Sequence, residues 1–425
     1  MNEDFLHYIW KYKLLFFNNL KTEDGQIIQV VSQGFHNYDA GPDFFNARIK
    51  IDDTLWAGNV EIHLKSSDWY LHKHNMDKKY DNIILHVVYD NDTDIYRTNN
   101  EKIPVVSIKN RFDESLLLRY KTLLANKSWV PCEKSIAELP LHFINIWKEK
   151  LIIERLIRKT ADIERRLSVT KNDWEQVFYE HLCRNFGFKV NATAFEMLAR
   201  ALPQKYIAKH SDSPLQTAAL LFGQAGFLSD TLPEAYPLEL YKEYLFLKAK
   251  YSLTPIDASL WNFLRIRPQN FPYIRLAQLA SLLRKEPFLF SKILDIKQPG
   301  EVYGLFKVNI HEYWNSHFTF AKGTNKKETG IGAQSIWNIA INTVVPFLFA
   351  YGHVKKEIRF KEKAFEILEK IPPEDNAIVK KWKVCGLAAI SAYDTQALIE
   401  LKNNYCNHKK CLSCMIGDKL LRNQE

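Results

Sequence analysis

The chain has 425 residues, which is more than one hydrophobic core usually accommodates, so two or three domains are expected. Hydrophobic residues make up 46% and charged residues 25%, which is typical of a soluble globular protein. No run of about 18 apolar residues occurs, so a membrane-spanning helix is not expected. The formal net charge of +9 favours a polyanionic partner such as nucleic acid.

The ends of the chain and its cysteines indicate the compartment. Residues 1–4 are acidic and lack the basic segment and the cleavage site of a signal peptide. Six cysteines are spread over the length without secretion signals, which indicates thiols or metal ligands rather than disulfides. We therefore expect a cytoplasmic protein that does not interact with membranes.

The first third of the sequence predicts a mixed helix and strand domain. Two strand-like runs flank the polar corner 52–54, which is a hairpin signal. A dense apolar run at 82–89 predicts a buried central strand. The expected elements in chain order are a helix at 4–17, strands at 27–31, 44–51 and 56–64, a helix or irregular segment at 66–80, and strands at 82–89, 95–96 and 103–108.

From about residue 140 the pattern becomes helical, with few strand signals. Helices are expected at 151–167, 174–186, 215–228, 238–251, 274–283, 335–350, 362–369, 376–389 and 395–401. The sequence therefore predicts an α+β protein in which an α/β domain at 1–135 precedes a large all-α domain at 136–425.

The hairpin carries acidic residues where a strand rarely buries them. Asp43 stands at the mouth of its first strand and Glu61 lies inside its second. A carboxylate in mid-strand is costly to bury without a partner, and a solvated strand face is the simplest explanation for one such residue. Here His63 and Lys65 follow on the same face as Glu61, which favours a functional site.

Strand parity opposes a site that contains both acids. The apolar residues occupy odd positions in the first strand and even positions in the second. A tight turn at Asp52 would pair those apolar faces and place Asp43 on the opposite face of the sheet from Glu61. A bulge at Gly58 or a kink at Gly41 is required to bring the two carboxylates together.

Histidines are concentrated before residue 87. His72 and His74, close in sequence to Glu61 and His63, could hold Zn²⁺ or Mn²⁺, since these ions favour imidazole. The alternative for His72 and His74 is a polar helix or loop face. His86, within an apolar strand, is more simply a hydrogen-bonded core histidine.

The C-terminus carries Cys406, Cys411 and Cys414 with His408 between them. The spacing C-x4-C-x2-C is typical of a metal site, with Cys132 or His408 as a candidate fourth ligand for Zn²⁺ or an iron–sulfur cluster. Reduced thiols packed around a terminal helix are the alternative.

A loop in the helical region carries Arg265, Arg267 and Arg275 around aromatic residues. Arginines interleaved with aromatic rings suit phosphate and base contacts, so these three are the candidate nucleic-acid-binding residues. A solvated loop anchored by Phe271 and Pro272 is the alternative.

Four stretches resemble an uncharacterised bacterial family, domain of unknown function 2851. They are 36–86, 129–133, 265–278 and 405–417, so the resemblance extends along essentially the whole chain. It implies no activity.

A more distant resemblance covers about residues 1–110. The order helix-strand-strand-strand-helix-strand is similar to the core of restriction-endonuclease-like enzymes, the PD-(D/E)xK superfamily. The Pro-Asp of that motif falls on Asp43 and its preceding proline, and the Glu-x-Lys falls on Glu61 to His63, with histidine in place of lysine. The resemblance implies Mg²⁺ or Mn²⁺ held by Asp43 and Glu61, and phosphodiester hydrolysis. His63 or Lys65 would then orient the attacking water or stabilise charge in the transition state.

These observations favour a metal-dependent nuclease-like protein that acts on or binds nucleic acid. The alternative is a scaffold with the same fold that has lost its chemistry through His63. A third hypothesis is a hydrolase of another substrate that uses Zn²⁺ on the histidine cluster.

Overall fold

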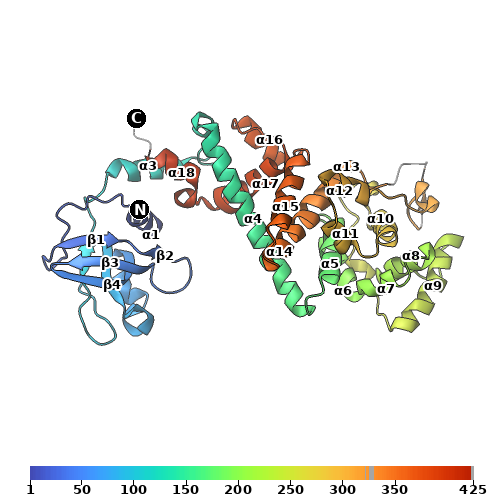
Figure 1. Cartoon of the computed structure of the whole chain (residues 1–425), viewed down its shortest axis with the longest axis horizontal. Helices are drawn as coiled ribbons and strands as arrows, with labels where there is room; N and C mark the ends of the chain where they lie inside the picture. The colour runs from blue at the N-terminus through green and yellow to red at the C-terminus, as the bar shows by residue number, and fades with distance from the viewer. Residues whose placement is uncertain (321, 325–329, 423–425) are drawn as a thin grey trace. The chain divides into compact units, whose positions relative to one another are not determined.

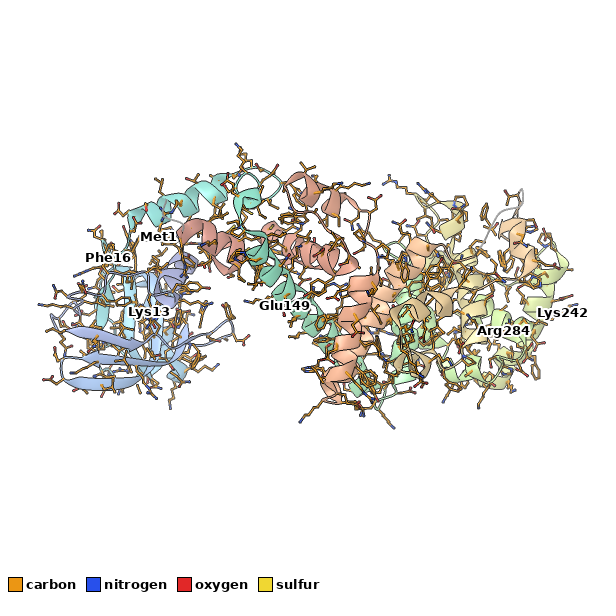
Figure 2. All side chains as sticks on the ribbon, turned by 45° about the horizontal axis from the view of Figure 1, so that its top comes forward. Met1, Lys13, Phe16, Glu149, Lys242 and Arg284 are labelled. Atoms are coloured by element: carbon orange, nitrogen blue, oxygen red, sulfur yellow. The ribbon has the colours of Figure 1, made fainter. Side chains whose placement is uncertain are left out.

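The computed structural model of the chain (Figure 1) describes residues 1–320, 322–324 and 330–422. The contacts within the chain divide it into two compact units, an N-terminal unit of Met1–Trp147 with Leu401–Glu425 and a helical unit of Lys148–Glu400. The C-terminal cysteine segment, expected in the helical domain, therefore packs within the N-terminal unit. Side chains project from both faces of the sheet in that unit (Figure 2).

The N-terminal unit is a mixed α and β structure, as the sequence predicts. Its strands are β1 (Ile28–Ser32), β2 (Phe35–His36), β3 (Phe44–Ile51), β4 (Thr54–Lys65), β5 (Ile83–Asp90) and β6 (Val105–Ser107). Its helices are α1 (Glu3–Lys11), α2 (Asp68–Leu71), α3 (Glu114–Ala125) and α18 (Met415–Arg422), with short turns η1 (His74–Met76), η2 (Lys78–Tyr80), η3 (Ile136–Glu138), η8 (Leu401–Tyr405), η9 (Cys406–His408) and η10 (Cys411–Ser413).

The sheet combines an antiparallel half with a parallel half. Its order is β1-β3-β4-β5-β6, with β2 paired to β3. β3 and β4 form the predicted hairpin, in which Ile51 pairs with Thr54 and Asp52 adopts φ +50°. β4 and β5 are parallel. The expected helix at 66–80 is instead α2 followed by the two short turns η1 and η2.

The two faces of the sheet pack against different side chains. Phe44, Val60 and Ile62 belong to a core that includes residues from α1, α3 and α18. The opposite face packs on a smaller apolar cluster of Trp69, Tyr80, Ile83, Val88, Ile95, Ile103 and Val105. Glu61 and His63 alternate with the core residues of β4, so they point towards this second face.

A register slip at Asn59 resolves the parity conflict. Phe44 pairs with Val60, whereas Ala47 pairs with Gly58, so β3 has one extra residue opposite Asn59. Asn46 in this bulge adopts φ +57° and donates its N–H to Asn59 Oδ1 at 3.3 Å. The bulge lies in β3 beside Gly58 rather than in β4, and it places Asp43 and Glu61 on the same face.

The helical unit begins within α4 (Leu141–Val169) and has one large apolar core. Its other helices are α5 (Trp174–Phe186), α6 (Ala192–Ala201), α7 (Gln204–Ala208), α8 (Pro214–Gln224), α9 (Ala235–Tyr251), α10 (Pro272–Lys285), α11 (Leu289–Leu294), α12 (Pro299–Phe306), α13 (Ala333–Ile339), α14 (Val345–Val354), α15 (Ile358–Lys370), α16 (Ala377–Val384) and α17 (Ala392–Glu400). The short elements are η4 (Ala258–Leu260), η5 (Pro268–Asn270), η6 (Glu312–Asn315), η7 (Ala340–Val344), β7 (His317–Thr319) and β8 (Lys322–Gly323).

One helical stretch of the described chain, Ala333–Val354, is long and apolar enough to cross a membrane by length and composition alone. Of its most apolar window, 67% is buried inside the structure, as in the core helix of a soluble protein.

The close approach of β4 and β5 gives a test of this register. A Cβ on Gly58 would lie 2.7 Å from Asn82 O and would also overlap Ile84, so Gly58→Ala must push the two strands apart. We expect a loss of about 1–3 kcal/mol in the stability of the N-terminal unit, measured by hydrogen exchange of β4 and β5 amides. Gly304→Ala in α12 is the control, because nothing lies within 4 Å of that Cβ position. Unchanged exchange in Gly58→Ala would contradict the register.

Candidate functional site

Histidines and acids from separate elements meet on the second face of the N-terminal sheet. Successive contacts connect His86, His63, His72, His74, Glu61, Asp43, His7 and His36. All six histidines that precede residue 87 therefore belong to one cluster, which we call the histidine–carboxylate cluster.

Asp43 and Glu61 are brought together by reciprocal backbone hydrogen bonds. The Asp43 N–H donates to Glu61 Oε2 at 3.1 Å, and the Ile62 N–H donates to Asp43 Oδ2 at 2.9 Å. Glu61 is only 4% exposed, whereas Asp43 is partly open to solvent. Because each carboxylate is held by the backbone beside the other, their positions are fixed by the sheet itself.

Four side-chain atoms around Glu61 have the spacing of metal ligands. Glu61 Oε1 lies 3.2 Å from His74 Nε2 and 3.5 Å from His63 Nε2, which is itself 3.2 Å from His72 Nδ1. The ligand nitrogens of the three histidines all lie within 4.8 Å of one another. Bonds of about 2.0–2.1 Å place tetrahedral ligand atoms roughly 3.3–3.4 Å apart. The three histidines are therefore the candidate ligands of a transition-metal ion, and the Glu61 carboxyl group lies beside two of them.

His86 supports the ring of His63 from the interior. His86 Nε2 lies 2.9 Å from His63 Nδ1, and the His86 side chain is fully buried. Metal-binding histidines usually use their second ring nitrogen in such a contact, which fixes the orientation of the ring. The sequence identified His86 as a core histidine, and it is one, but its partner is a candidate ligand.

Burial sets the ionisation of the cluster when no cation is bound. Burial and the neighbouring charge of Asp43 raise the pKa of Glu61 from 4.5 to about 9. Burial, together with His72 and His74, lowers the pKa of His63 from 6.5 to about 3. The His63 ring is thus neutral and available as a ligand at pH 7, while Glu61 carries a proton that a metal ion would displace.

Asp43 forms an ion pair with His7 of α1. His7 Nε2 lies 3.2 Å from Asp43 Oδ2. Burial lowers the pKa of His7, but the hydrogen bond and the charge of Asp43 outweigh it, so the net shift is upwards. The neighbouring Asp43 thus favours the protonated form of His7.

Two residues of this region escaped the sequence reasoning. Glu3 lies one helical turn before His7, and burial raises the pKa of its carboxyl group. His36 stacks on Phe44 with ring centroids 4.8 Å apart, and burial lowers its pKa to about 4. The spacing of Glu3 and His7 on one helix face was a usable signal for Glu3, and the concentration of histidines before residue 87 was the signal for His36.

The other predicted residues lie elsewhere. Lys65 is exposed at the end of β4, where its N–H donates to Asp68 Oδ2. Arg265 and Arg267 are exposed in the helical unit. Arg275 is 4% exposed and donates to Gln278, Asn270 and Ser335, so its guanidinium holds the surrounding loop together.

The C-terminal cysteines lie in the N-terminal unit with Cys132. Cys132, Cys411 and Cys414 are 7–9% exposed and Cys406 is half-buried. Lys402 Nζ donates to Trp129 O at 2.7 Å, and Lys409 Nζ donates to Leu124 O at 2.9 Å. These bonds hold the C-terminal segment against the stretch that leads to Cys132.

The thiols of this segment influence one another. Burial raises the pKa of Cys406, and the nearby Cys414, Cys132 and Cys411 raise it further. Burial also raises the pKa of Cys414 to about 11, although the N–H groups of Gly417 and Ile416 lower it. A bound cation would stabilise the thiolate form of these cysteines. The Zn²⁺ or iron–sulfur site at these cysteines stays a prediction.

Comparison with known proteins assigns a family. The family model described as a protein of unknown function, DUF2851, matches residues 3–377. Neither the curated proteins nor the solved structures contain a match to the chain.

The raised pKa of Glu61 predicts an unusual pH dependence for metal-free protein. Since folded Glu61 keeps its proton up to about pH 9 and the unfolded chain loses it near 4.5, stability should fall as pH rises through this window. The lowered pKa of His63 makes stability rise with pH, but only below about pH 6.5, so it does not affect the range above pH 7. Between pH 7 and 8.5 the protonation of folded Glu61 should therefore lower the free energy of unfolding by about 1.4 kcal/mol per unit rise in pH.

Urea unfolding in the presence of a chelator measures this slope. Glu61→Gln should abolish it, whereas Glu114→Gln, at an exposed position in α3, should not. Saturating Zn²⁺ or Mn²⁺ should flatten the slope, because the ion holds Glu61 ionised in the folded state. If stability falls with pH as steeply in Glu61→Gln as in the unmodified protein, Glu61 is not the protonated group that causes the slope.

The cysteine segment gives a separate metal prediction. Protein purified without oxygen should contain zinc or iron near one equivalent at the cysteines by elemental analysis, beyond any metal on the histidines. Cys414→Ser should remove it and His74→Ala should not, with Cys183→Ala, in the core of α5, as the control. If the unmodified protein contains neither zinc nor iron at the cysteines, these thiols serve packing alone.

Proposed function

Because the chain belongs to the DUF2851 family, whose description assigns no function, we propose one from the site: a metal-dependent phosphodiesterase of the nuclease type. The observation that carries this proposal is the convergence of Asp43, Glu61 and three histidines on one face of β4. Phosphodiester hydrolysis needs a cation that neutralises developing charge, and ligands with fixed positions that hold it.

The order of elements supports the same proposal. When the two-residue strand β2 and the short turns η1 and η2 are set aside, α1, β1, β3, β4, α2 and β5 have the order helix-strand-strand-strand-helix-strand, with β4 parallel to β5. This order and the positions of Asp43 and Glu61 at the centre of the sheet are similar to the restriction-endonuclease-like core. The bulge opposite Asn59 supplies the change in parity that this similarity requires.

The residues divide the chemistry between them. His63, His72, His74 and Glu61 hold a divalent transition-metal ion, which when bound supplies Lewis-acid stabilisation of the phosphoryl oxygens. Asp43, fixed by the Ile62 N–H, raises the pKa of His7. His7 is then the candidate general acid that delivers a proton to the leaving oxygen. His63 serves as a ligand rather than as the substitute for lysine.

Nucleic acid is the proposed substrate. The net charge of +9 and the exposed Arg265 and Arg267 supply the positive charge that phosphate backbones attract.

A catalytically inactive scaffold is the second candidate, and one observation favours it. Glu61 Oε1 stands at ligand distance from His74 and His63. Three imidazoles and a carboxylate complete a tetrahedral shell, and such closed sites are usually structural. The scaffold would then use its positive charge for binding alone.

Cleavage assays separate the two candidates. The protein loaded with Mn²⁺, Zn²⁺ or Mg²⁺ should cleave single- or double-stranded DNA or RNA, and Asp43→Asn or Glu61→Gln should reduce the rate by at least about 100-fold, because these changes remove charge at the reacting centre. Lys65→Met is the control, since the Lys65 side chain is exposed and the hydrogen bond of Lys65 to Asp68 is made by its backbone N–H.

Binding measured on the same variants completes the test. Loss of cleavage with retained, salt-dependent binding supports the enzyme. Salt-dependent binding without cleavage by the unmodified protein under all three metals would favour the scaffold. Neither binding nor cleavage would contradict both candidates.

A further inference from the structure

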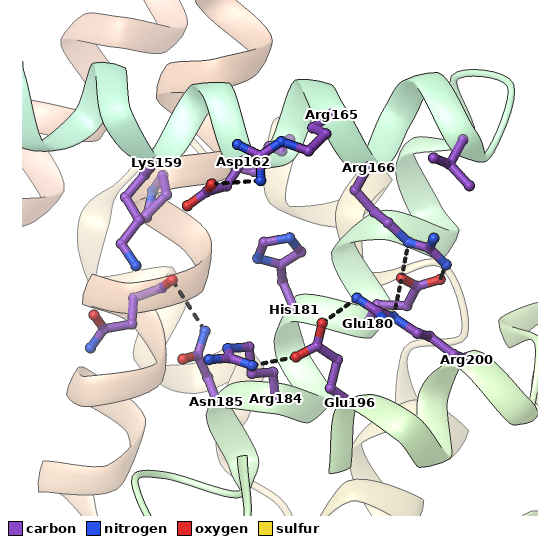
Figure 3. A pocket seen from close by; sticks show the side chains of 14 residues that line it. Lys159, Asp162, Arg165, Arg166, Glu180, His181, Arg184, Asn185, Glu196 and Arg200 are labelled. Carbon is purple, nitrogen blue, oxygen red and sulfur yellow. Dashed lines mark hydrogen bonds and ion pairs between the residues drawn. The ribbon is translucent and has the colours of Figure 1, made fainter. Parts of the chain in front are cut away.

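The helical unit contains a charged cavity of about 420 Å³, lined by α4, α5, α6 and the α13–α14 segment (Figure 3). It is independent of the histidine–carboxylate cluster, which lies wholly in the N-terminal unit. The basic side chains that line it are Lys159, Arg165, Arg166, Arg184 and Arg200. Its acidic side chains are Asp162, Glu180 and Glu196. Five cations against three anions leave an excess of two positive charges.

The three carboxylates are already held by arginines. Arg165 pairs with Asp162 at 3.3 Å, and Arg166 donates to Glu180 at 2.9 Å. Glu196 accepts from both Arg184 and Arg200. These pairs fix the guanidinium groups around the cavity but leave some of their N–H donors for a ligand.

Lys159 and His181 supply the side chains that are available to a ligand in the cavity. Both side chains point into the space between the helices in Figure 3. Lys159 is half-buried and makes no ion pair within the described residues. Burial, together with Arg155 and Arg158, lowers its pKa. Burial also lowers the pKa of His181 to about 4, so its ring is neutral at pH 7.

A second unpaired cation lies behind the wall of the cavity. Arg155 is 6% exposed, and its guanidinium donates to Asn342 Oδ1 at 3.0 Å rather than to a carboxylate of the described chain. Asn342 lies in the π-helical turn η7, whose backbone carbonyl accepts from Asn185 Nδ2 at 3.2 Å. Such π-turns within α-helices frequently occur at functional sites.

We propose that this cavity binds a small phosphorylated molecule through its phosphate group. Lys159 has no ion pair within the described residues and lies near Arg155, Arg158 and Arg184, and like charges held together are destabilising unless an anion joins them. A phosphate dianion matches the excess of two positive charges, and arginine and lysine donors match its oxygens. The cations line a partly open cavity of ligand size, about 420 Å³, which favours a small molecule over a polynucleotide backbone.

The experiment measures thermal unfolding of the full chain with inorganic phosphate, pyrophosphate and adenosine 5′-monophosphate. Chelator is present to keep the histidines free of metal, and sodium chloride holds the ionic strength constant. At millimolar ligand the unfolding temperature should rise by about 2–4 °C. A rise with the ester but not with inorganic phosphate identifies an organic phosphate as the ligand, and a rise with all three identifies recognition of the phosphate group alone.

Lys159→Met is the decisive variant. Without ligand it should unfold at the same temperature as the unmodified chain or higher, because it removes a cation packed beside other cations, and the ligand should then add nothing. Lys159→Arg should restore the response. Lys242→Met, at an exposed position in α9, and Glu61→Gln, in the other unit, should respond like the unmodified chain.

No response of the unmodified chain to any of the three probes would overturn the proposal, and so would an undiminished response in Lys159→Met. Because the cavity lies in the helical unit and Glu61 in the N-terminal unit, failure of the nuclease assays leaves this result interpretable.

Discussion

The burial of Glu61 is the constraint around which the N-terminal unit is built. Its side chain is 4% exposed on a central strand, where an ionised carboxylate without a partner would cost several kcal/mol. One backbone N–H, from Asp43, donates to Oε2, and the ion-pair partners of Oε1 among the described residues are the ring nitrogens of His63 and His74. The protein can therefore keep Glu61 neutral with a proton or ionised with a cation. That choice links stability, pH and metal binding at a single residue.

The sheet geometry that makes this possible depends on Asn59. Both neighbouring strands change register beside it, β3 through the bulge at Asn46 and β5 between Ile83 and Leu85. The Asn59 side chain accepts from Asn46, and its N–H donates to Asn82 O. A regular pairing would have turned Asp43 to the other face. The site is thus a product of two local irregularities rather than of the strand pattern.

Sequence patterns predicted the parts of this arrangement that depend on local order. The hairpin at Asp52, the buried strand at 82–89 and the need for a break in parity all followed from periodicity and turn chemistry. Gly58 was a candidate position for this break, but the sequence did not show that the extra residue lies in β3, opposite Asn59. Sequence alone missed the contact of His63 with His86, and it suggested the return of the C-terminal segment to the N-terminal unit only through Cys132 as a candidate fourth ligand. Both join residues that are far apart in the chain.

The histidine at position 63 changes the chemistry that the fold can support. A lysine there would add a fixed positive charge beside His72 and His74, and would offer no lone pair to a metal. The neutral His63 ring instead directs Nε2 towards Glu61 and His72. Imidazole ligands shift the preference of a site from Mg²⁺, which takes oxygen ligands and water, towards zinc, manganese or iron. Under the proposed nuclease-like function, His63 is therefore better explained as a change of metal than as the loss of a catalytic cation, since His72 and His74 also converge where that metal would lie.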